Sequence, residues 1–170
     1  MKRIFDLVVA ILMLVLALPI ILVSAIVVGL TSKGPALFAH TRCGRNGVPF
    51  ECLKLRTMVV NAQDWLEQDS ELRAKYKENG FKLRPEEDPR ITRVGRLLRL
   101  RYIDELPQLV NVIRGDMSLV GPRPVIDEEL EWYGDRKDKI LSVRPGIFGS
   151  WTALGRTRPD YPERTLVELD

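Results

Sequence analysis

The stretch LVVAILMLVLALPIILVSAIVVGL, residues 7–30, decides the fold of this chain because it contains no charged residue. Ser24 is its single side-chain polar group. A straight helix of this length extends about 36 Å, which exceeds a bilayer hydrocarbon core of about 30 Å. The stretch therefore predicts a helix embedded in a membrane.

Three topologies are open for this helix. A cleaved signal peptide has an apolar core of about 7–15 residues, shorter than this run. A spanning helix fits the length. Pro19 lies near the midpoint, however, where it removes a backbone hydrogen bond and favours a kink or break. Each half is then about 18 Å long and too short to cross alone.

The charges that flank the stretch bear on the same choice. Lys2 and Arg3 precede it, and Lys33 and Arg42 follow it. The positive-inside rule orients a spanning helix by a difference in basic residues between its two ends, and here both ends are basic. A re-entrant helix, which bends at Pro19 and returns to the same membrane face, satisfies both observations. From the residues alone, the re-entrant and spanning topologies both stay open.

Outward from this stretch the pattern becomes that of a globular domain, with 29% charged residues over the whole chain. Gly44-Arg45-Asn46-Gly47 separates two apolar segments and predicts a β-hairpin. Helical patterns follow at residues 60–78, 91–100, 105–114, 126–133 and around Asp138. We expect an α+β, predominantly helical fold: a membrane helix over 1–32, then a globular domain over 33–170 that contains a small hairpin. The resemblance described below makes the helix re-entrant and the globular domain cytoplasmic.

The cysteine and histidine content argues against a zinc site. Cys43 and Cys52 lie close together without metal-ligand spacing, and His40 is the single histidine. We interpret the thiols as reduced or buried and His40 as structural. The net charge is +3, a mild basic excess.

An acidic pair stands next to a helix start in Asp104-Glu105-Leu106-Pro107-Gln108. Proline is tolerated in the first turn of a helix, so Pro107 predicts a helix start just before it. Asp104 then lies near the N-cap, where free N–H groups favour negative charge. The pair can simply cap the helix. Alternatively, Asp104 acts as an ionised nucleophile that needs no base, and Glu105 beside it helps to hold a divalent cation.

Two further patterns bring arginines together. The run Arg90, Arg93, Arg96, Arg99 and Arg101 precedes the acidic pair, with a helical spacing of three over part of its length. It is either a solvated face or a phosphate-binding surface for substrate or lipid headgroup, since the guanidinium group matches phosphate oxygens.

The second pattern is a rigid turn. In Gly121-Pro122-Arg123-Pro124 two prolines restrict the backbone around Arg123. Arg144-Pro145-Gly146 and Gly155-Arg156 are weaker signals of the same kind. A membrane segment, an arginine-rich surface and an acidic pair together indicate a lipid phosphate substrate and Mg²⁺.

These motifs resemble the bacterial sugar transferase family, the monotopic polyprenyl-phosphate phosphoglycosyltransferases. The resemblance rests on ordered segments that cover the whole chain: Lys2-Arg3-Ile4-Phe5-Asp6, Lys54-Leu55-Arg56-Thr57-Met58, Asp104-Glu105-Leu106-Pro107-Gln108, Gly115-Asp116-Met117-Ser118, Val120-Gly121-Pro122-Arg123-Pro124 and Arg144-Pro145-Gly146. Gly149-Ser150-Trp151 and Asp160-Tyr161 are most similar to the catalytic domains of undecaprenyl-phosphate galactose or glucose phosphotransferases.

The resemblance implies a function and a site. The chain would transfer a sugar 1-phosphate from a UDP-sugar to undecaprenyl or another polyprenyl phosphate and release UMP, which would start exopolysaccharide, O-antigen or glycoconjugate synthesis. Asp104 would be the nucleophile of a ping-pong cycle, with Mg²⁺ held by Glu105 and Asp104. The phosphate-binding residues would be Lys54, Arg56, Arg99, Arg123, Arg144 and Arg156. The resemblance also favours the re-entrant helix with its break at Pro19.

It further implies a place at the cytoplasmic face of the bacterial inner membrane, in contact with membrane lipid. Whether the chain forms a homo-dimer is left open. A nucleic-acid partner is disfavoured by the 7% aromatic content and by the position of the arginines beside a membrane segment.

The chain departs from the family pattern at three places. Leu18-Pro19 stands where relatives often have Ser-Pro, and Thr152 and Thr157 replace a Gln and an Asn that flank the late Gly-Arg. Relatives continue past residue 170, so we expect family elements to be missing after that point. The alternative function is a membrane-tethered module that binds anionic lipid without catalysis.

Overall fold

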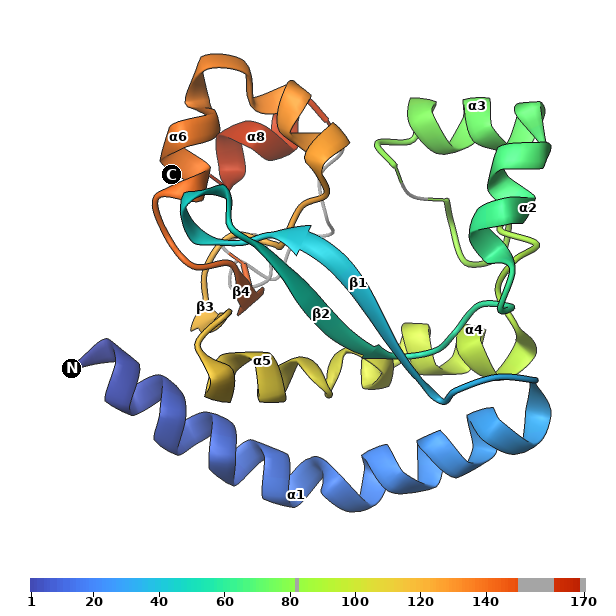
Figure 1. The fold of residues 1–170 in the computed structure, drawn as a ribbon, viewed down its shortest axis with the longest axis horizontal. Coiled ribbons are helices and arrows are strands. Elements are labelled where there is room, and N and C mark those ends of the chain that lie inside the picture. The colour runs from blue at the N-terminus through green and yellow to red at the C-terminus, as the bar shows by residue number, and fades with distance from the viewer. Residues whose placement is uncertain (82, 150–160, 169–170) are drawn as a thin grey trace. The chain divides into compact units, whose positions relative to one another are not determined.

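The computed structural model describes residues 1–81, 83–149 and 161–168, and it is mostly helical (Figure 1). The strands form two small sheets, β1 with β2 and β3 with β4. The α-helices are α1 (Lys2–Thr31), α2 (Ala62–Gln68), α3 (Ser70–Glu78), α4 (Arg93–Leu100), α5 (Gln108–Arg114), α6 (Lys137–Leu141) and α8 (Glu163–Val167). The 3₁₀ helices are η1 (Arg45–Gly47), η2 (Ile103–Glu105) and η3 (Asp127–Arg136). The strands are β1 (Leu37–Cys43), β2 (Pro49–Leu55), β3 (Ser118–Val120) and β4 (Gly146–Phe148).

Contacts divide the chain into two compact units. Unit 1 comprises Met1–Leu16, Ala39–Leu53 and Gln108–Asp170, and unit 2 comprises Ala17–Phe38 and Lys54–Pro107. The predicted domains, a membrane segment over 1–32 and a cytoplasmic domain over 33–170, are defined by their position relative to a membrane rather than by contacts within the chain. This division therefore stays a prediction.

Helix α1 is long and apolar enough to cross a membrane, and it is the one such helix among the described residues. It runs without interruption through Pro19, so the expected division into two short helices is not seen, and a bend at that residue stays a prediction. Its buried residues recur every three or four positions, which places them along one side; they include Ala10, Ala17, Ile21, Ser24 and Val28. Most of its other large apolar side chains are exposed, as expected for a helix in contact with lipid.

In unit 1 the first residues of α1 bind the C-terminal end of α5 and the segment that follows it. The Arg3 guanidinium donates to the carbonyl oxygens of Val112 and Ile113, near the C-terminal end of α5. Lys2 binds the Ser118 hydroxyl, and that hydroxyl donates to the buried Asp6 carboxylate at 2.8 Å. A guanidinium at a helix C-terminus meets the negative end of the helix dipole, which stabilises this contact.

The rest of unit 1 confirms the predicted hairpin and adds a second sheet. Strands β1 and β2 form the hairpin around η1, where Asn46 takes the left-handed conformation with φ 59°. Strands β3 and β4 pair in parallel, with Val120 opposite Phe148. Gly146 is required there because a side chain would overlap the backbone of Gly121.

In unit 2 helix α4 packs against the chain that leaves β2. The Thr92 hydroxyl caps α4 by accepting from the Gly95 N–H at 2.9 Å, and the Thr57 carbonyl accepts from the Thr92 N–H at 3.0 Å. A side chain at Gly95 would overlap the Thr57 carbonyl, so the backbones touch directly. The predicted helix over 60–78 is in fact two helices, because Asp69 ends α2 and caps α3 by accepting from the Leu72 N–H.

Candidate active site

The acidic pair lies in the short helix η2, between α4 and α5. Tyr102 precedes it with φ 55°, a left-handed conformation that turns the chain sharply away from α4. Asp104 is only 6% exposed. Helix α5 begins at Gln108 rather than before Pro107, so Asp104 belongs to a separate turn and is not the N-cap of that helix. The sequence therefore predicted a helix start near the pair but assigned Asp104 to the wrong turn.

Lys54, from the end of β2, lies next to this turn. Its ammonium nitrogen donates to the Glu105 carboxylate at 2.7 Å, and both side chains are largely shielded from solvent. A charge-assisted bond in a partly buried place is stronger than one at the surface. It holds the Lys54 charge within electrostatic reach of Asp104.

Arg99, from the last turn of α4, supplies a second positive charge. Its Nε donates to the Thr57 hydroxyl at 2.8 Å, which anchors one edge of the guanidinium. The charge of Asp104 acts on Arg99, so the two groups lie within interaction range. Two cations from different elements of unit 2 thus act electrostatically on one buried carboxylate.

Burial and charge act on Asp104 in opposite directions. Burial raises the pKa of the Asp104 carboxyl above its usual value, and the neighbouring Glu105 charge adds to this; Lys54 and Arg99 pull the pKa down. Burial likewise lowers the pKa of Arg99, while Asp104 opposes that change. We expected the N-terminal end of a helix to keep Asp104 ionised. The ionised form is instead favoured mainly by the charges of Lys54 and Arg99, which act against the effect of burial.

Arg56 is bonded to backbone rather than to this turn. Its guanidinium donates to the carbonyl oxygens of Ser32 at 3.0 Å and Gly34 at 2.9 Å, and it also binds that of Lys33. The side chain is buried and links the end of α1 to the start of unit 2's second segment. We therefore leave Arg56 out of the proposed phosphate site.

The remaining predicted phosphate ligands belong to unit 1 or lie outside the described residues. Arg123 and Arg144 come from neighbouring backbone segments, because the Gly146 N–H donates to the Pro122 carbonyl at 2.8 Å. Arg123 is half-buried and Arg144 is exposed. Arg156, like Thr152 and Thr157, is outside the described residues, and so is Trp151.

The arginine run divides into members with different surroundings. Arg90 is buried and forms a bidentate pair with Asp88, with both bonds at 2.8 Å. Arg93, Arg96 and Arg101 are exposed, and Arg99 alone turns inward to Thr57. The run is therefore not one continuous phosphate-binding surface.

Asp104 and Glu105 offer two adjacent carboxylates, which is the kind of donor set that Mg²⁺ prefers. Within the described part of the chain no group of three or more His, Cys, Asp or Glu side chains is arranged to hold a metal. An ion at this turn would therefore need further oxygen ligands from a bound phosphate or from water.

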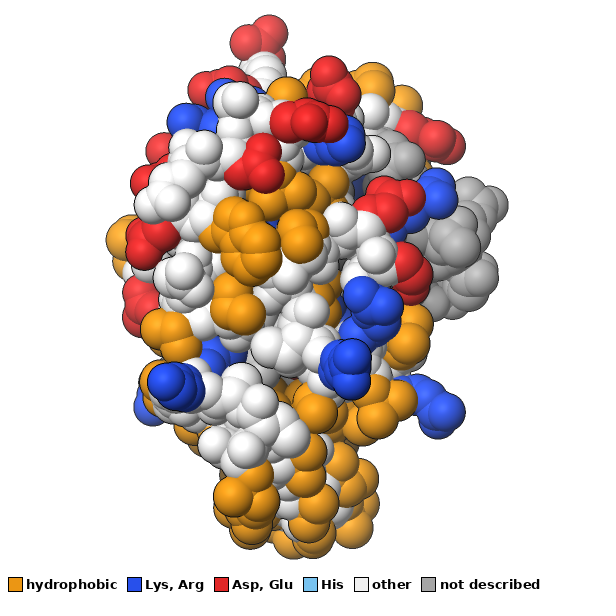
Figure 2. Space-filling view, turned by 90° about the vertical axis from the view of Figure 1, so that its right-hand side faces the viewer, with side chains coloured by type: hydrophobic (Ala, Val, Ile, Leu, Met, Phe, Trp, Pro, Cys, Tyr) orange, Lys and Arg blue, Asp and Glu red, His pale blue; other side chains and the backbone are white. Residues whose placement is uncertain are grey.

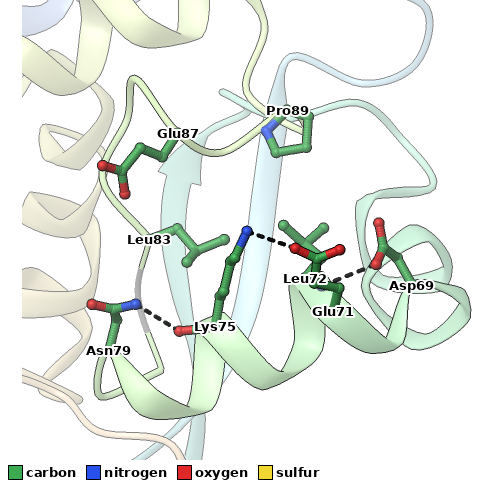
Figure 3. A pocket seen from close by; sticks show the side chains of 8 residues that line it. All are labelled: Asp69, Glu71, Leu72, Lys75, Asn79, Leu83, Glu87 and Pro89. Atoms are coloured by element: carbon green, nitrogen blue, oxygen red, sulfur yellow. Dashed lines mark hydrogen bonds and ion pairs between the residues drawn. The ribbon is translucent and has the colours of Figure 1, made fainter.

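A pocket of about 540 Å³ lies elsewhere in unit 2, at the α3 end. The Lys75 ammonium pairs with the Glu71 carboxylate at 2.9 Å. Both side chains line the pocket together with Leu83 (Figure 3). Asp69 and Glu87 add further negative charge to its lining, and none of the predicted site residues contributes to it. Its acidic lining disfavours a phosphate ligand.

Sequence reasoning missed two polar residues that build the site. Thr57 anchors Arg99 from 42 positions away, and no local pattern indicates that pairing. Thr92 does carry a signal, since a threonine just before a helical pattern is a typical N-cap.

Comparison with known proteins places these observations in a family context. A family model described as bacterial sugar transferase matches residues 1–170. An undecaprenyl-phosphate galactose phosphotransferase from Salmonella typhimurium is 46% identical over 172 residues, which cover 99% of this chain and 35% of that protein. The exopolysaccharide production protein ExoY of Sinorhizobium fredii is 42% identical, over 98% of this chain and 74% of its own length.

A third relative is the UDP-glucose:undecaprenyl-phosphate glucose-1-phosphate transferase of Caulobacter vibrioides. It is 44% identical over 151 residues, covering 87% of this chain and 51% of the relative. This chain thus spans about a third of the length of the Salmonella protein and half that of the Caulobacter protein.

Proposed function

The chain belongs to the bacterial sugar transferase family, and from that premise we propose that it transfers a sugar 1-phosphate from a UDP-sugar to a polyprenyl phosphate. One observation carries the proposal: the buried Asp104 carboxylate is within reach of two cations, Lys54 and Arg99. The names of the Salmonella and Caulobacter relatives support undecaprenyl phosphate as the acceptor, and that of the Sinorhizobium relative supports a role in exopolysaccharide production.

In the first half-reaction an Asp104 carboxylate oxygen attacks the phosphorus that carries the sugar. A bond forms between that oxygen and phosphorus, and the bond from the same phosphorus to the bridging oxygen breaks. UMP leaves with the bonding electron pair. In the second half-reaction an oxygen of the polyprenyl phosphate attacks this phosphorus, releases Asp104 and yields a polyprenyl diphosphate sugar. One carboxylate thus serves both steps, as in a ping-pong cycle.

Lys54 and Arg99 favour this chemistry by electrostatics. The carboxylate must be ionised to attack, and both cations lower the pKa that burial raises. The approaching diphosphate carries negative charge, which a lone buried carboxylate would repel. Preorganised cations beside the reacting group stabilise the added charge without needing to reorganise.

Mg²⁺ fits the same turn as a cofactor. Asp104 and Glu105 would hold it together with oxygens of the bound diphosphate, and Glu105 would exchange part of its contact with Lys54 for the ion. When bound, the ion neutralises charge on the diphosphate and on the leaving UMP.

We further propose that α1 is re-entrant, so that both of its ends lie at one membrane face. Arg3 at its start binds carbonyls near the end of α5, and the Ser32 and Gly34 carbonyls after its end bind Arg56. No second helix among the described residues is long and apolar enough to cross a membrane. The chain that connects the segments bound to the two ends of α1 therefore contains no described helix that could cross a membrane. This connection favours a position at the same membrane face for both ends of α1.

The basic residues at both ends of α1 favour the cytoplasmic face of the bacterial inner membrane. A soluble nucleotide sugar then approaches the site from the aqueous side, and the acceptor approaches within the membrane.

UMP release from a panel of UDP-sugars, with Mg²⁺ and undecaprenyl phosphate, tests the proposed function. We expect release that requires Mg²⁺ with at least one donor, and loss of that release in Asp104→Asn. Asp138→Asn, an exposed acid on α6, is the matched control and should retain activity. Release that persists in Asp104→Asn would exclude this residue as nucleophile and leave it as a structural turn residue.

A further inference from the structure

A buried arginine beside a buried carboxylate commonly closes an ion pair with two hydrogen bonds, and unit 2 contains one such pair in Asp88 and Arg90. Arg90 donates from Nε and from Nη2 to the two carboxylate oxygens of Asp88, with both bonds at 2.8 Å. Both side chains are almost completely buried. The planar guanidinium matches the planar carboxylate in this side-on arrangement. An unrestrained Arg99 would be expected to bind Asp104 in the same way.

Arg99 and Asp104 do not form this pair. Arg99 lowers the pKa of the Asp104 carboxyl, so the two charges do interact. Within the part of the chain that the structure describes, however, no ion pair or hydrogen bond joins the two side chains. The carboxylate is therefore close to a guanidinium without being bonded to it.

The Thr57 hydroxyl occupies the nitrogen that a side-on pair would need. Arg99 donates from Nε to this hydroxyl at 2.8 Å, and Nε is one of the two nitrogens that Arg90 uses toward Asp88. Thr57 is buried, and its carbonyl accepts from the Thr92 N–H at 3.0 Å, which fixes the backbone below the hydroxyl. The two Nη nitrogens of Arg99 have no hydrogen-bond partner among the described residues. Arg99 is thus held by one edge and can donate to an anion from the other.

Lys54, the other cation that acts on Asp104, is also held by a group other than this carboxylate. Its ammonium nitrogen donates to Glu105 at 2.7 Å, and its side chain is only 18% exposed. Lys and Arg side chains elsewhere lie at the surface, as on the face drawn in Figure 2. Both shielded cations near Asp104 therefore contribute charge while a different residue accepts their hydrogen bonds.

A direct ion pair would oppose the chemistry proposed for Asp104. A carboxylate whose two oxygens both accept from a guanidinium must lose one of those bonds before it can attack phosphorus. Breaking a hydrogen-bonded ion pair is costly where water is largely excluded. The same pair would occupy the guanidinium that should stabilise the added charge of the diphosphate. A cation held at a distance avoids both costs.

We propose that Thr57 is a positioning residue, whose hydroxyl holds Arg99 by Nε and so prevents the guanidinium from closing an ion pair with Asp104. The Asp104 oxygens stay available for attack, and the Nη nitrogens of Arg99 stay available for the diphosphate of the donor. The catalytic part of this inference rests on the proposed function. The arrangement of the three side chains does not depend on it.

The Nε–H resonance of Arg99 tests the arrangement without any activity. The full chain in detergent micelles would carry isotopically labelled arginine, and the resonance would be assigned by its loss in Arg99→Lys. In Thr57→Val we expect this resonance to move and to move again when Asp104→Asn is added, because the carboxylate has become the acceptor. In the wild type, where Thr57 is the acceptor, Asp104→Asn should cause a clearly smaller shift. Equal shifts on Asp104→Asn in the two backgrounds would overturn the proposal.

UMP release from the UDP-sugar tests the consequence for catalysis. Thr57→Val should lower kcat roughly tenfold or more, because a small misplacement of reacting groups costs that much. Thr57→Ser keeps the hydroxyl and should recover most of this loss. Thr165→Val is the matched control, since Thr165 is a buried threonine of unit 1 whose hydroxyl accepts from Arg136 at 3.3 Å. It should keep the kcat of the wild type, and an undiminished kcat in Thr57→Val would contradict the proposed role.

The same substitution in an Arg99→Gln background separates positioning from general damage to the fold. If Thr57 acts through Arg99, Thr57→Val should add almost no further loss of kcat once the guanidinium is absent. A loss by the same factor in both backgrounds would give Thr57 a purely structural role and overturn the proposal. A failure of the proposed function would appear differently, as a wild-type chain that releases no UMP, and the comparison of the Arg99 resonances would still decide whether Thr57 holds Arg99 away from Asp104.

Discussion

At the scale of single residues, the site depends on how Asp104 is charged in a place that water barely reaches. Burial disfavours its ionised form, and Lys54 and Arg99 favour it. Catalytic groups commonly sit in such opposed environments, because the same charge that is costly in the resting protein is useful once substrate arrives. Asp104 is therefore expected to lower the stability of the ligand-free protein at neutral pH.

Asp104→Asn should for that reason raise stability while it removes activity. Because the pKa of Asp104 is raised on folding, the folded state binds this proton more tightly than the unfolded chain does. The stability penalty is complete above the folded pKa and disappears as pH falls to the unfolded value. Denaturant unfolding in detergent should show a gain on the order of 1 kcal/mol at neutral pH, and a smaller gain in mild acid. A variant less stable than the wild type at neutral pH would contradict this.

Lys54→Met should change the pH dependence of UMP release. Lys54 exerts the largest of the effects that lower the Asp104 pKa, so its removal raises that pKa further. The acidic limb of the rate profile should move to higher pH, since the nucleophile must be ionised. Lys75→Met, which removes an exposed lysine paired with Glu71 on α3, should leave the limb in place. An unmoved limb in Lys54→Met would separate Lys54 from the titration of the nucleophile.

At the scale of elements, the contact of α4 with the strand exit at Thr57 places Arg99 near the acidic turn. The Thr57 carbonyl accepts from Thr92, and the Thr57 hydroxyl accepts from Arg99. This contact requires the two backbones to touch at Gly95. The position of Arg99 therefore depends on a residue that has no side chain.

Gly95→Ala should be strongly destabilising. The added methyl group would overlap the Thr57 carbonyl, a backbone atom that cannot rotate away. Overpacking of this kind costs about 3 kcal/mol. Gly29→Ala in α1 is the matched control because nothing lies within 4 Å of the added group. Thermal unfolding should show a clear loss for the first and little change for the second, and equal stabilities would contradict the close contact.

The elements differ in how well the sequence predicted them. The apolar helix, the hairpin and α4 follow from local patterns, and all three are confirmed. The separate turn of Asp104 and the split at Asp69 were missed, because proline and capping signals locate a helix end only to within a few residues.

The residues of the candidate site were predicted only in part. The reason is not the imprecision of predicted helix ends. Asp104, Glu105, Lys54 and Arg99 carry recognisable motifs and do come together in unit 2. Arg56 carries the same kind of motif, yet its guanidinium binds backbone carbonyls after α1. A motif indicates a residue type, whereas the partner of a long side chain depends on tertiary contacts that no local pattern records.

At the scale of the whole molecule, the proposed re-entrant topology requires both ends of α1 to face the cytoplasm. Single cysteines at Lys2 and Lys33 should react equally with a membrane-impermeant reagent in inside-out vesicles, and neither should react in intact cells. Asp138→Cys on α6 marks the cytoplasmic side as a control. Reaction of the two positions from opposite sides would establish a spanning helix and exclude the re-entrant one.

Trapping the covalent intermediate tests the central claim most directly. The full chain would be mixed with UDP-sugar and Mg²⁺ without lipid acceptor, quenched in acid and examined by mass spectrometry of the intact protein and its peptides. We predict a mass increase of one sugar phosphate, located on Asp104, which is lost when undecaprenyl phosphate is added before the quench. UMP release without any such adduct, or an adduct on another residue, would contradict Asp104 as the nucleophile.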